Sequence, residues 1–167
     1  MRRRFTILAL AALATGCPAP QGESGILELD VGQYEAYVHP VFEGSCATLD
    51  CHGDEGRPLR LYSETGLRLR DDLRAPVGAP TIPATAEELA ANVQSIRAID
   101  VERPLPETRF LVLKPLSNVA GGIHHYGGRI WTGTDDPAYR CVLSWLYHAL
   151  DTEACAAAAA RDGLPPI

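Results

Sequence analysis

Apolar residues recur at helical spacing near the start of the chain. From residue 31 onward they are Val31, Tyr34, Tyr37, Val38, Val41 and Phe42. This spacing places them on one face of a helix. Because proline lacks a backbone N–H and its ring crowds the preceding turn, Pro40 predicts that this helix kinks or stops near His39.

Two later segments repeat this periodicity and have clear start signals. Thr85 and Glu88 form a capping box, and Asp136 with Pro137 form an N-cap followed by a first-turn proline. The apolar face of the second helix is Leu89, Val93, Ile96 and Ile99, and that of the last helix is Ala138, Val142, Trp145 and Ala149, broadened by Leu143, Leu146 and Leu150. Residues 53–84 are rich in glycine and proline and predict loops, and no segment predicts a sheet of any size. The expected fold is therefore mainly α with long loops.

The first residues have the pattern of an export signal. Three arginines precede a short apolar stretch, Phe5–Leu13, and a bilayer span needs ~20 apolar residues. Ala14-Thr15-Gly16-Cys17 resembles the lipobox of bacterial lipoproteins. We expect residues 1–16 to be a signal peptide, Cys17 to be lipidated and residues 17–27 to form a flexible tether; simple cleavage with Cys17 unmodified is the alternative. Both imply export, and the lipid form implies a periplasmic or outer-membrane lipoprotein whose only membrane attachment is its lipid.

The charge balance restricts the partners. Removal of residues 1–16 leaves 12 basic and 21 acidic residues, a formal charge of −9. Such a chain repels the phosphates of nucleic acids and anionic lipid headgroups, so nucleic-acid binding is not expected.

The most informative motif is Cys46-Ala47-Thr48-Leu49-Asp50-Cys51-His52. Two cysteines followed directly by histidine are the attachment pattern of c-type haem, in which the thiols bond to the porphyrin and the imidazole binds the iron. The usual spacing has two residues between the cysteines, and this chain has four. The alternatives are a small disulfide loop with His52 incidental, or a zinc site, although no second Cys/His pair with zinc-ligand spacing is present.

A second iron ligand has few candidates. Met1 is the only methionine and leaves with the signal, so the ligand must be histidine or, less readily, Lys114, the only lysine. His39 and His148 fit packing and helix-end roles. Two histidines, His124 and His125, lie in a glycine-rich loop that could reach over a flat cofactor; His125 is our predicted ligand and His124 its substitute.

The two remaining cysteines, Cys141 and Cys155, could pair in an exported protein. A continuous helix would separate them by about 21 Å, at ~1.5 Å per residue. A disulfide therefore requires the helix to end between them, and Asp151-Thr152 offers a break.

Three stretches, in chain order, carry a family resemblance. They are His39-Pro40-Val41-Phe42 leading into residues 46–53 and Leu67-Arg68-Leu69; Phe110-Leu111-Val112-Leu113-Lys114-Pro115-Leu116; and His125-Tyr126-Gly127-Gly128 with Asp136-Pro137-Ala138-Tyr139-Arg140 and Trp145-Leu146. Together they resemble the cytochrome c-like domains of many exported proteins of planctomycetes and myxobacteria. The resemblance implies a cytochrome c-like helical domain over residues 28–163 with one covalent haem c on Cys46 and Cys51, His52 as proximal ligand and His125 at the family's motif histidine. In such folds the first and last helices cross, which implies that Trp145 packs at that crossing or near the porphyrin.

The expected function is single-electron transfer with an unidentified redox protein, not catalysis. Neither a nucleophile–base arrangement nor paired carboxylates support hydrolytic chemistry. Two alternatives stay open: a non-redox interaction module with Cys46 and Cys51 as a disulfide, and a haem enzyme or ligand sensor with an open sixth iron site.

Overall fold

The computed structural model describes residues 28–100 and 103–161. The predicted signal, Cys17 and the tether lie outside the described residues, as do the last two residues of the predicted domain. The described part is helical and contains no β-strand; its β-type pairings are two isolated bridges, Tyr62–Leu67 and Leu116–Trp131. The prediction of a mainly α fold is confirmed.

The N-terminal helix consists of three consecutive segments, α1 (Val31–Gln33), η1 (Tyr34–Val38) and α2 (His39–Ser45). The sequence predicts that this helix kinks or stops near His39; it does not stop there, but its π-helical segment ends at Val38, next to that point. η1 has the wider turn of a π-helix, and Pro40 lies directly after it in the first turn of α2. A wider turn leaves room for the proline ring and for its missing N–H, so the helix continues to Ser45.

The second predicted helix is α3 (Ala86–Ile99), and its capping box is present. The Glu88 amide donates to Thr85 Oγ1 at 3.2 Å, and the Thr85 amide donates to Glu88 Oε2 at 2.9 Å. Leu89, Val93 and Ile96 are buried as predicted. The start and the apolar face of this helix are therefore confirmed.

Short helical turns follow α3. They are η3 (Pro106–Thr108), α4 (Phe110–Leu113) and η4 (Asn118–Ala120). The carboxylate of Asp100, the residue after α3, accepts hydrogen bonds from the amides of Phe110 at 2.7 Å and Leu111 at 3.1 Å. The end of α3 thus caps the start of α4 and fixes where the following loop begins.

The C-terminal part forms two helices, α5 (Pro137–Leu146) and α6 (Thr152–Ala159), with the predicted N-cap at Asp136. The placement of Ala149 on the apolar face is wrong, because α5 ends at Leu146 and Ala149 is exposed. His148 takes a left-handed conformation (φ 56°) that ends the helix, and Asp151 caps α6. This break brings Cys141 and Cys155 together in a disulfide with a Cα–Cα distance of 4.7 Å.

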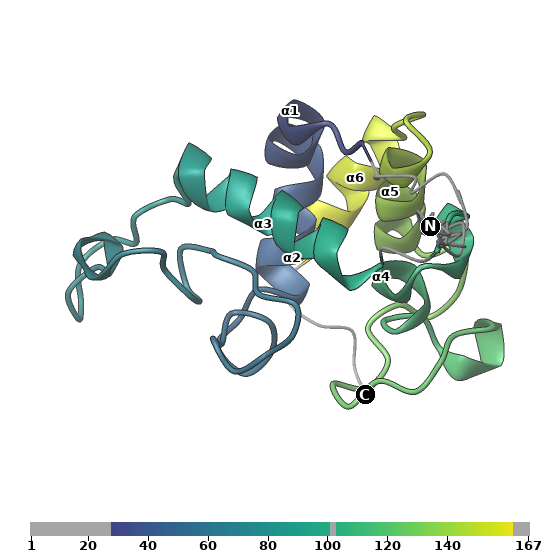
Figure 1. The fold of residues 1–167 in the computed structure, drawn as a ribbon, viewed down its shortest axis with the longest axis horizontal. Helices are drawn as coiled ribbons and strands as arrows, with labels where there is room; N and C mark the ends of the chain where they lie inside the picture. The colour runs from purple at the N-terminus through teal and green to yellow at the C-terminus, as the bar shows by residue number, and fades with distance from the viewer. Residues whose placement is uncertain (1–27, 101–102, 162–167) are drawn as a thin grey trace, which may run out of the picture.

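The N-terminal helix and the two C-terminal helices pack against each other (Figure 1). Trp145 is fully buried there: its indole Nε1 donates to the carbonyl of Asp30 at 3.1 Å, and its ring centre lies 5.5 Å from that of Tyr34. Trp145 therefore packs between the first and the last part of the fold.

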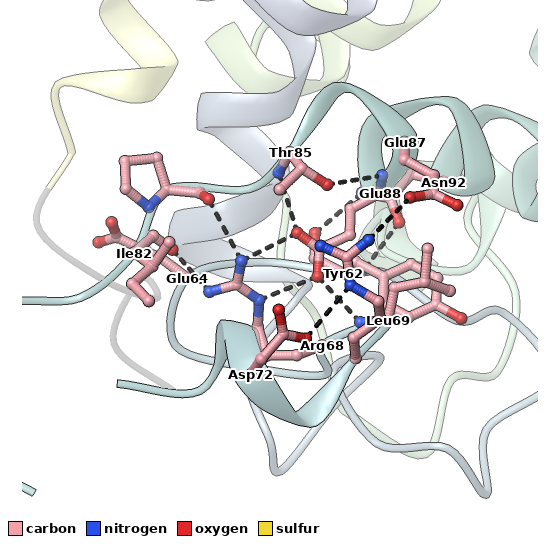
Figure 2. A network of polar contacts seen from close by, with 12 residues as sticks. Tyr62, Glu64, Arg68, Leu69, Asp72, Ile82, Thr85, Glu87, Glu88 and Asn92 are labelled. Carbon is pink, nitrogen blue, oxygen red and sulfur yellow. Dashed lines mark hydrogen bonds and ion pairs between the residues drawn. The ribbon is translucent and has the colours of Figure 1, made fainter. Parts of the chain in front are cut away.

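Residues 53–84 form the long loop expected there, with one short turn, η2 (Asp71–Leu73). Polar side chains of α3 hold this loop (Figure 2). The Glu88 carboxylate accepts two hydrogen bonds from the Arg68 guanidinium and one from the Leu69 amide, and Asn92 exchanges two hydrogen bonds with the backbone of Tyr62. The loop that leaves the Cys–His motif is therefore fixed along α3.

Across the described residues, none of the helices combines the length and the apolar character needed to traverse a bilayer.

Candidate functional site

The Cys46–His52 motif forms a closed turn directly after α2. The amide of His52 donates to the carbonyl of Cys46 at 2.9 Å, and the amides of Cys51 and Gly53 both donate to the carbonyl of Thr48 at 2.9 Å. The four residues between the cysteines are thus taken up by a hydrogen-bonded turn. Both cysteines and the histidine remain on one short segment that follows a rigid helix.

The two thiols of this turn are free and partly accessible. Burial raises the pKa of the Cys46 thiol to about 11, opposed by a contact with the Ser45 hydroxyl and reinforced by the nearby Cys51. Without a bound metal, Cys46 is therefore a neutral thiol at neutral pH.

His52 has a fixed orientation. Its Nδ1 lies 2.9 Å from the carbonyl oxygen of Leu59, and since a carbonyl only accepts, Nδ1 carries the hydrogen. Burial lowers the pKa of His52, partly offset by the Leu59 hydrogen bond and reinforced by His125 and Arg57. The ring is therefore neutral at neutral pH, with the Nε2 lone pair available to a metal.

His125 has a similar arrangement on a separate loop. Its Nδ1 lies 3.0 Å from the carbonyl oxygen of Gly128, so this nitrogen also carries the hydrogen. The Gly128 amide donates back to the carbonyl of His125 at 2.9 Å, which closes a tight turn. Nε2 is again the nitrogen available for coordination.

The structure brings these two imidazoles together from positions 73 residues apart. Their ring centres are 6.1 Å apart and their planes differ by 9°. A histidine nitrogen binds a transition metal at about 2.0–2.1 Å and lies ~1.1 Å from its ring centre, so two imidazoles on opposite sides of one ion have centres about 6.3 Å apart. The observed distance between the ring centres is close to this value.

Among residues 28–100 and 103–161, no group of three or more His, Cys, Asp or Glu side chains has metal-binding geometry. A haem supplies four nitrogens of its own and needs only two axial ligands from the protein. The residues present, two free thiols and two oriented imidazoles, therefore fit a covalently attached haem.

The other candidate ligands lie elsewhere. His124 is exposed and packs edge-to-face on Tyr126 at 4.9 Å. Lys114 Nζ lies 3.4 Å from the carbonyl of His124, to which it donates. His39 is buried, with Nε2 3.6 Å from the Glu43 carboxylate, and His148 is an exposed residue after α5. Of these histidines, it is His125 that the structure pairs with His52.

Several functional positions escaped the sequence analysis. The carbonyls of Leu59 and Gly128 orient the two rings, and backbone groups leave no mark in a sequence. Gly53 is needed because a Cβ there would lie 2.2 Å from the carbonyl oxygen of Ala47. Gly122, before the His125 turn, would place a Cβ 2.0 Å from the carbonyl oxygen of Leu116. In the sequence, the glycine next to His52 and the glycines close to His125 were the features that could have marked these tight approaches.

A hollow of about 240 Å³ adjoins His125. Its lining includes Lys114, Ser117, Val119 and Arg129, so it combines two cations with polar and apolar groups.

Comparison of the chain with protein-family models, with curated proteins and with solved structures found no match.

Proposed function

We propose that this protein is an exported monohaem c-type cytochrome that carries single electrons. Cys46 and Cys51 would attach the haem, and His52 and His125 would bind its iron. The observation that carries the proposal is the 6.1 Å spacing of the two nearly parallel imidazoles, each oriented through Nδ1 by a backbone carbonyl. A haem in this position supplies an iron that changes oxidation state by one electron.

The residues of the chain have separate tasks in this proposal. The turn that follows α2 holds both thiols beside His52, and the loop fixed on α3 carries the Leu59 carbonyl that orients that ring. The His125–Gly128 turn holds the second imidazole. Because His52 and His125 would both bind the iron and leave it no position for a substrate, the proposal is electron transfer and not catalysis.

The proposal includes the cytochrome c-like fold and the location. The order of the elements supports the fold: a helix, the attachment turn, a late ligand loop and a terminal helical pair packed on the first helix. The basic and apolar N-terminal residues with Cys17 support an exported, lipid-anchored form.

Haem staining after denaturing electrophoresis tests the attachment, because only a covalently bound haem survives denaturation. We expect the protein, produced in a host with cytochrome maturation, to stain, and C46S/C51S not to stain. C141S/C155S is the matched control, since it removes two cysteines outside the motif, and it should stain. An unstained wild-type band would refute the proposal and favour the interaction module.

A further inference from the structure

The segment that carries His125 has an unusual charge for this acidic chain. Between Glu107 and Asp135 there is no aspartate or glutamate, although the whole chain has 21. The same segment contains Arg109, Lys114 and Arg129, of which Arg109 is buried. Its two accessible charged side chains, Lys114 and Arg129, are therefore both cationic.

The side chains of this segment form a surface that we name the His125 face: Lys114, Val119, His124, Tyr126 and Arg129. Lys114, Val119, His124 and Arg129 line the 240 Å³ hollow beside His125. Val119 and Tyr126 are 94% and 95% exposed, so their apolar groups stand fully in solvent. The face thus combines positive charge with exposed apolar side chains next to one axial ligand.

The turn that carries His52 has the opposite character. Asp50, Asp54 and Glu55 are exposed there, against two exposed arginines, Arg57 and Arg60. The guanidinium of Arg57 donates to the backbone carbonyl of Asp50 at 3.2 Å. The two sides of the candidate haem site therefore differ in sign, negative around His52 and positive around His125.

We propose that the His125 face docks an acidic redox protein, which exchanges one electron with this protein. The inference rests on the proposed function. One electron leaves the reduced protein and enters the oxidised partner, and no bond forms or breaks. Carboxylates of the partner meet Lys114 and Arg129, while Val119 and Tyr126 provide apolar contact that a small anion would not need. Opposite charges speed encounter while leaving the complex weak enough to dissociate.

The rate at which a charged reagent oxidises the protein either rises or falls with salt, and the direction shows whether the reagent meets like or opposite charge. Ferricyanide, a trianion, oxidises the reduced protein by one electron. If the net charge of −9 governed the approach, salt would screen repulsion and raise the rate. We expect the reverse: a rate that falls on the order of tenfold between low and high salt, because the His125 face attracts the anion.

Charge-reversal variants show whether the His125 face causes the expected fall of the rate with salt. In K114E/R129E, and to a smaller degree in R129E alone, the rate should rise with salt instead. The single variant R129E is included because it keeps the hydrogen bond from Lys114 to the His124 carbonyl. A change of sign in R129E therefore cannot result from a loop disturbed by the loss of that bond. The matched control is R70E/R74E, which makes the same charge change on exposed arginines beside η2, at the other end of the molecule (Figure 1). It should keep the wild-type sign.

A binding measurement separates a docking face from a small-anion site. Titration calorimetry with poly-glutamate should show binding to the haem-loaded wild type and to R70E/R74E, weakened at least tenfold in K114E/R129E. Equal competition by free glutamate at the same carboxylate concentration would overturn the docking proposal. So would a ferricyanide rate that rises with salt in the wild type. A protein without haem would refute the proposed function itself, whereas these results refute only the docking face.

Discussion

His125 is the residue whose side chain most directly sets the proposed redox properties, because in our proposal it would be the second iron ligand. Methionine in that place raises the reduction potential of a haem relative to histidine. We therefore expect H125M to have a higher potential than the wild type, and H125A to lose the six-coordinate low-spin absorption spectrum. Optical redox titration and visible absorption measure both effects.

His124 provides the control for this prediction. It is adjacent in sequence but packs on Tyr126 and is exposed. H124A should keep the wild-type spectrum and potential. A spectrum unchanged in H125A but altered in H124A would show that the wrong histidine has been assigned, and an unchanged spectrum in both would favour an open sixth site.

Gly53 is a residue at which a single methyl group should matter. A Cβ there would lie 2.2 Å from the Ala47 carbonyl oxygen, so the turn must open to accept it. We expect G53A to lower the free energy of unfolding by about 1–3 kcal/mol, the usual range for overpacking. Urea denaturation measures it.

Gly44 is the matched glycine, because it lies in α2 and a Cβ there meets nothing within 4 Å. Alanine is the better helix former by up to about 1 kcal/mol, so G44A should leave the stability unchanged or raise it. If both variants lost stability equally, the close approach at Gly53 would not be the reason.

At the scale of elements, the buried pair of Arg68 and Glu88 joins the long loop to α3 (Figure 2). Burial alone would raise the pKa of Glu88, but hydrogen bonds from Arg68, Thr85 and Leu69 lower it to about 2, against 4.5 ordinarily. A carboxyl with a lowered folded-state pKa contributes stability above its unfolded pKa and loses it as the pH falls towards the folded value. The loop should therefore weaken between about pH 4.5 and pH 2.

E88Q isolates this contribution. The wild type should be more stable than E88Q at pH 5, and the difference in unfolding free energy should shrink by about 2 kcal/mol on going to pH 3. Urea denaturation at both pH values measures it. D72N, which alters the exposed partner of Arg70, should show no such change. A difference that stayed constant with pH would contradict the lowered pKa.

The elements were predictable to different degrees. α3 followed from its capping box and its apolar spacing, both of which are local signals. The continuation of the first helix beyond Pro40 could not be predicted, because it depends on a π-helical turn that no residue pattern marks. The end of α5 at Leu146 could not be predicted either. The left-handed residue that follows the helix is His148, whereas glycine is the usual residue in that conformation.

The candidate site shows the same division. Cys46, Cys51 and His52 lie within seven residues of one another, so the sequence alone could propose them as one site. The choice of His125 came from two histidines among glycines and a family resemblance, but its position 6.1 Å from His52 depends on how the loops pack. The anchoring contacts of Asn92 and Glu88 to the loop join residues 19 to 30 positions apart, and no local pattern predicts them.

For the whole molecule, the state of the cysteines distinguishes the interpretations. We expect Cys141 and Cys155 to react with an alkylating reagent only after reduction, because they form a disulfide. Cys46 and Cys51 should not react before or after reduction, because thioether bonds resist mild reductants. Peptide mass spectrometry of the mature protein reports each site, and also whether Cys17 carries lipid. Alkylation of Cys46 and Cys51 after reduction would support the interaction module instead.

The most direct test of two parallel histidines on one iron is the electron paramagnetic resonance spectrum of the oxidised protein. Parallel imidazole planes split the iron orbitals strongly and give a low-spin spectrum with three well-resolved g-values. The 9° angle between His52 and His125 predicts that spectrum. A high-spin signal, or no haem signal from stained and correctly matured protein, would contradict the ligand pair proposed here.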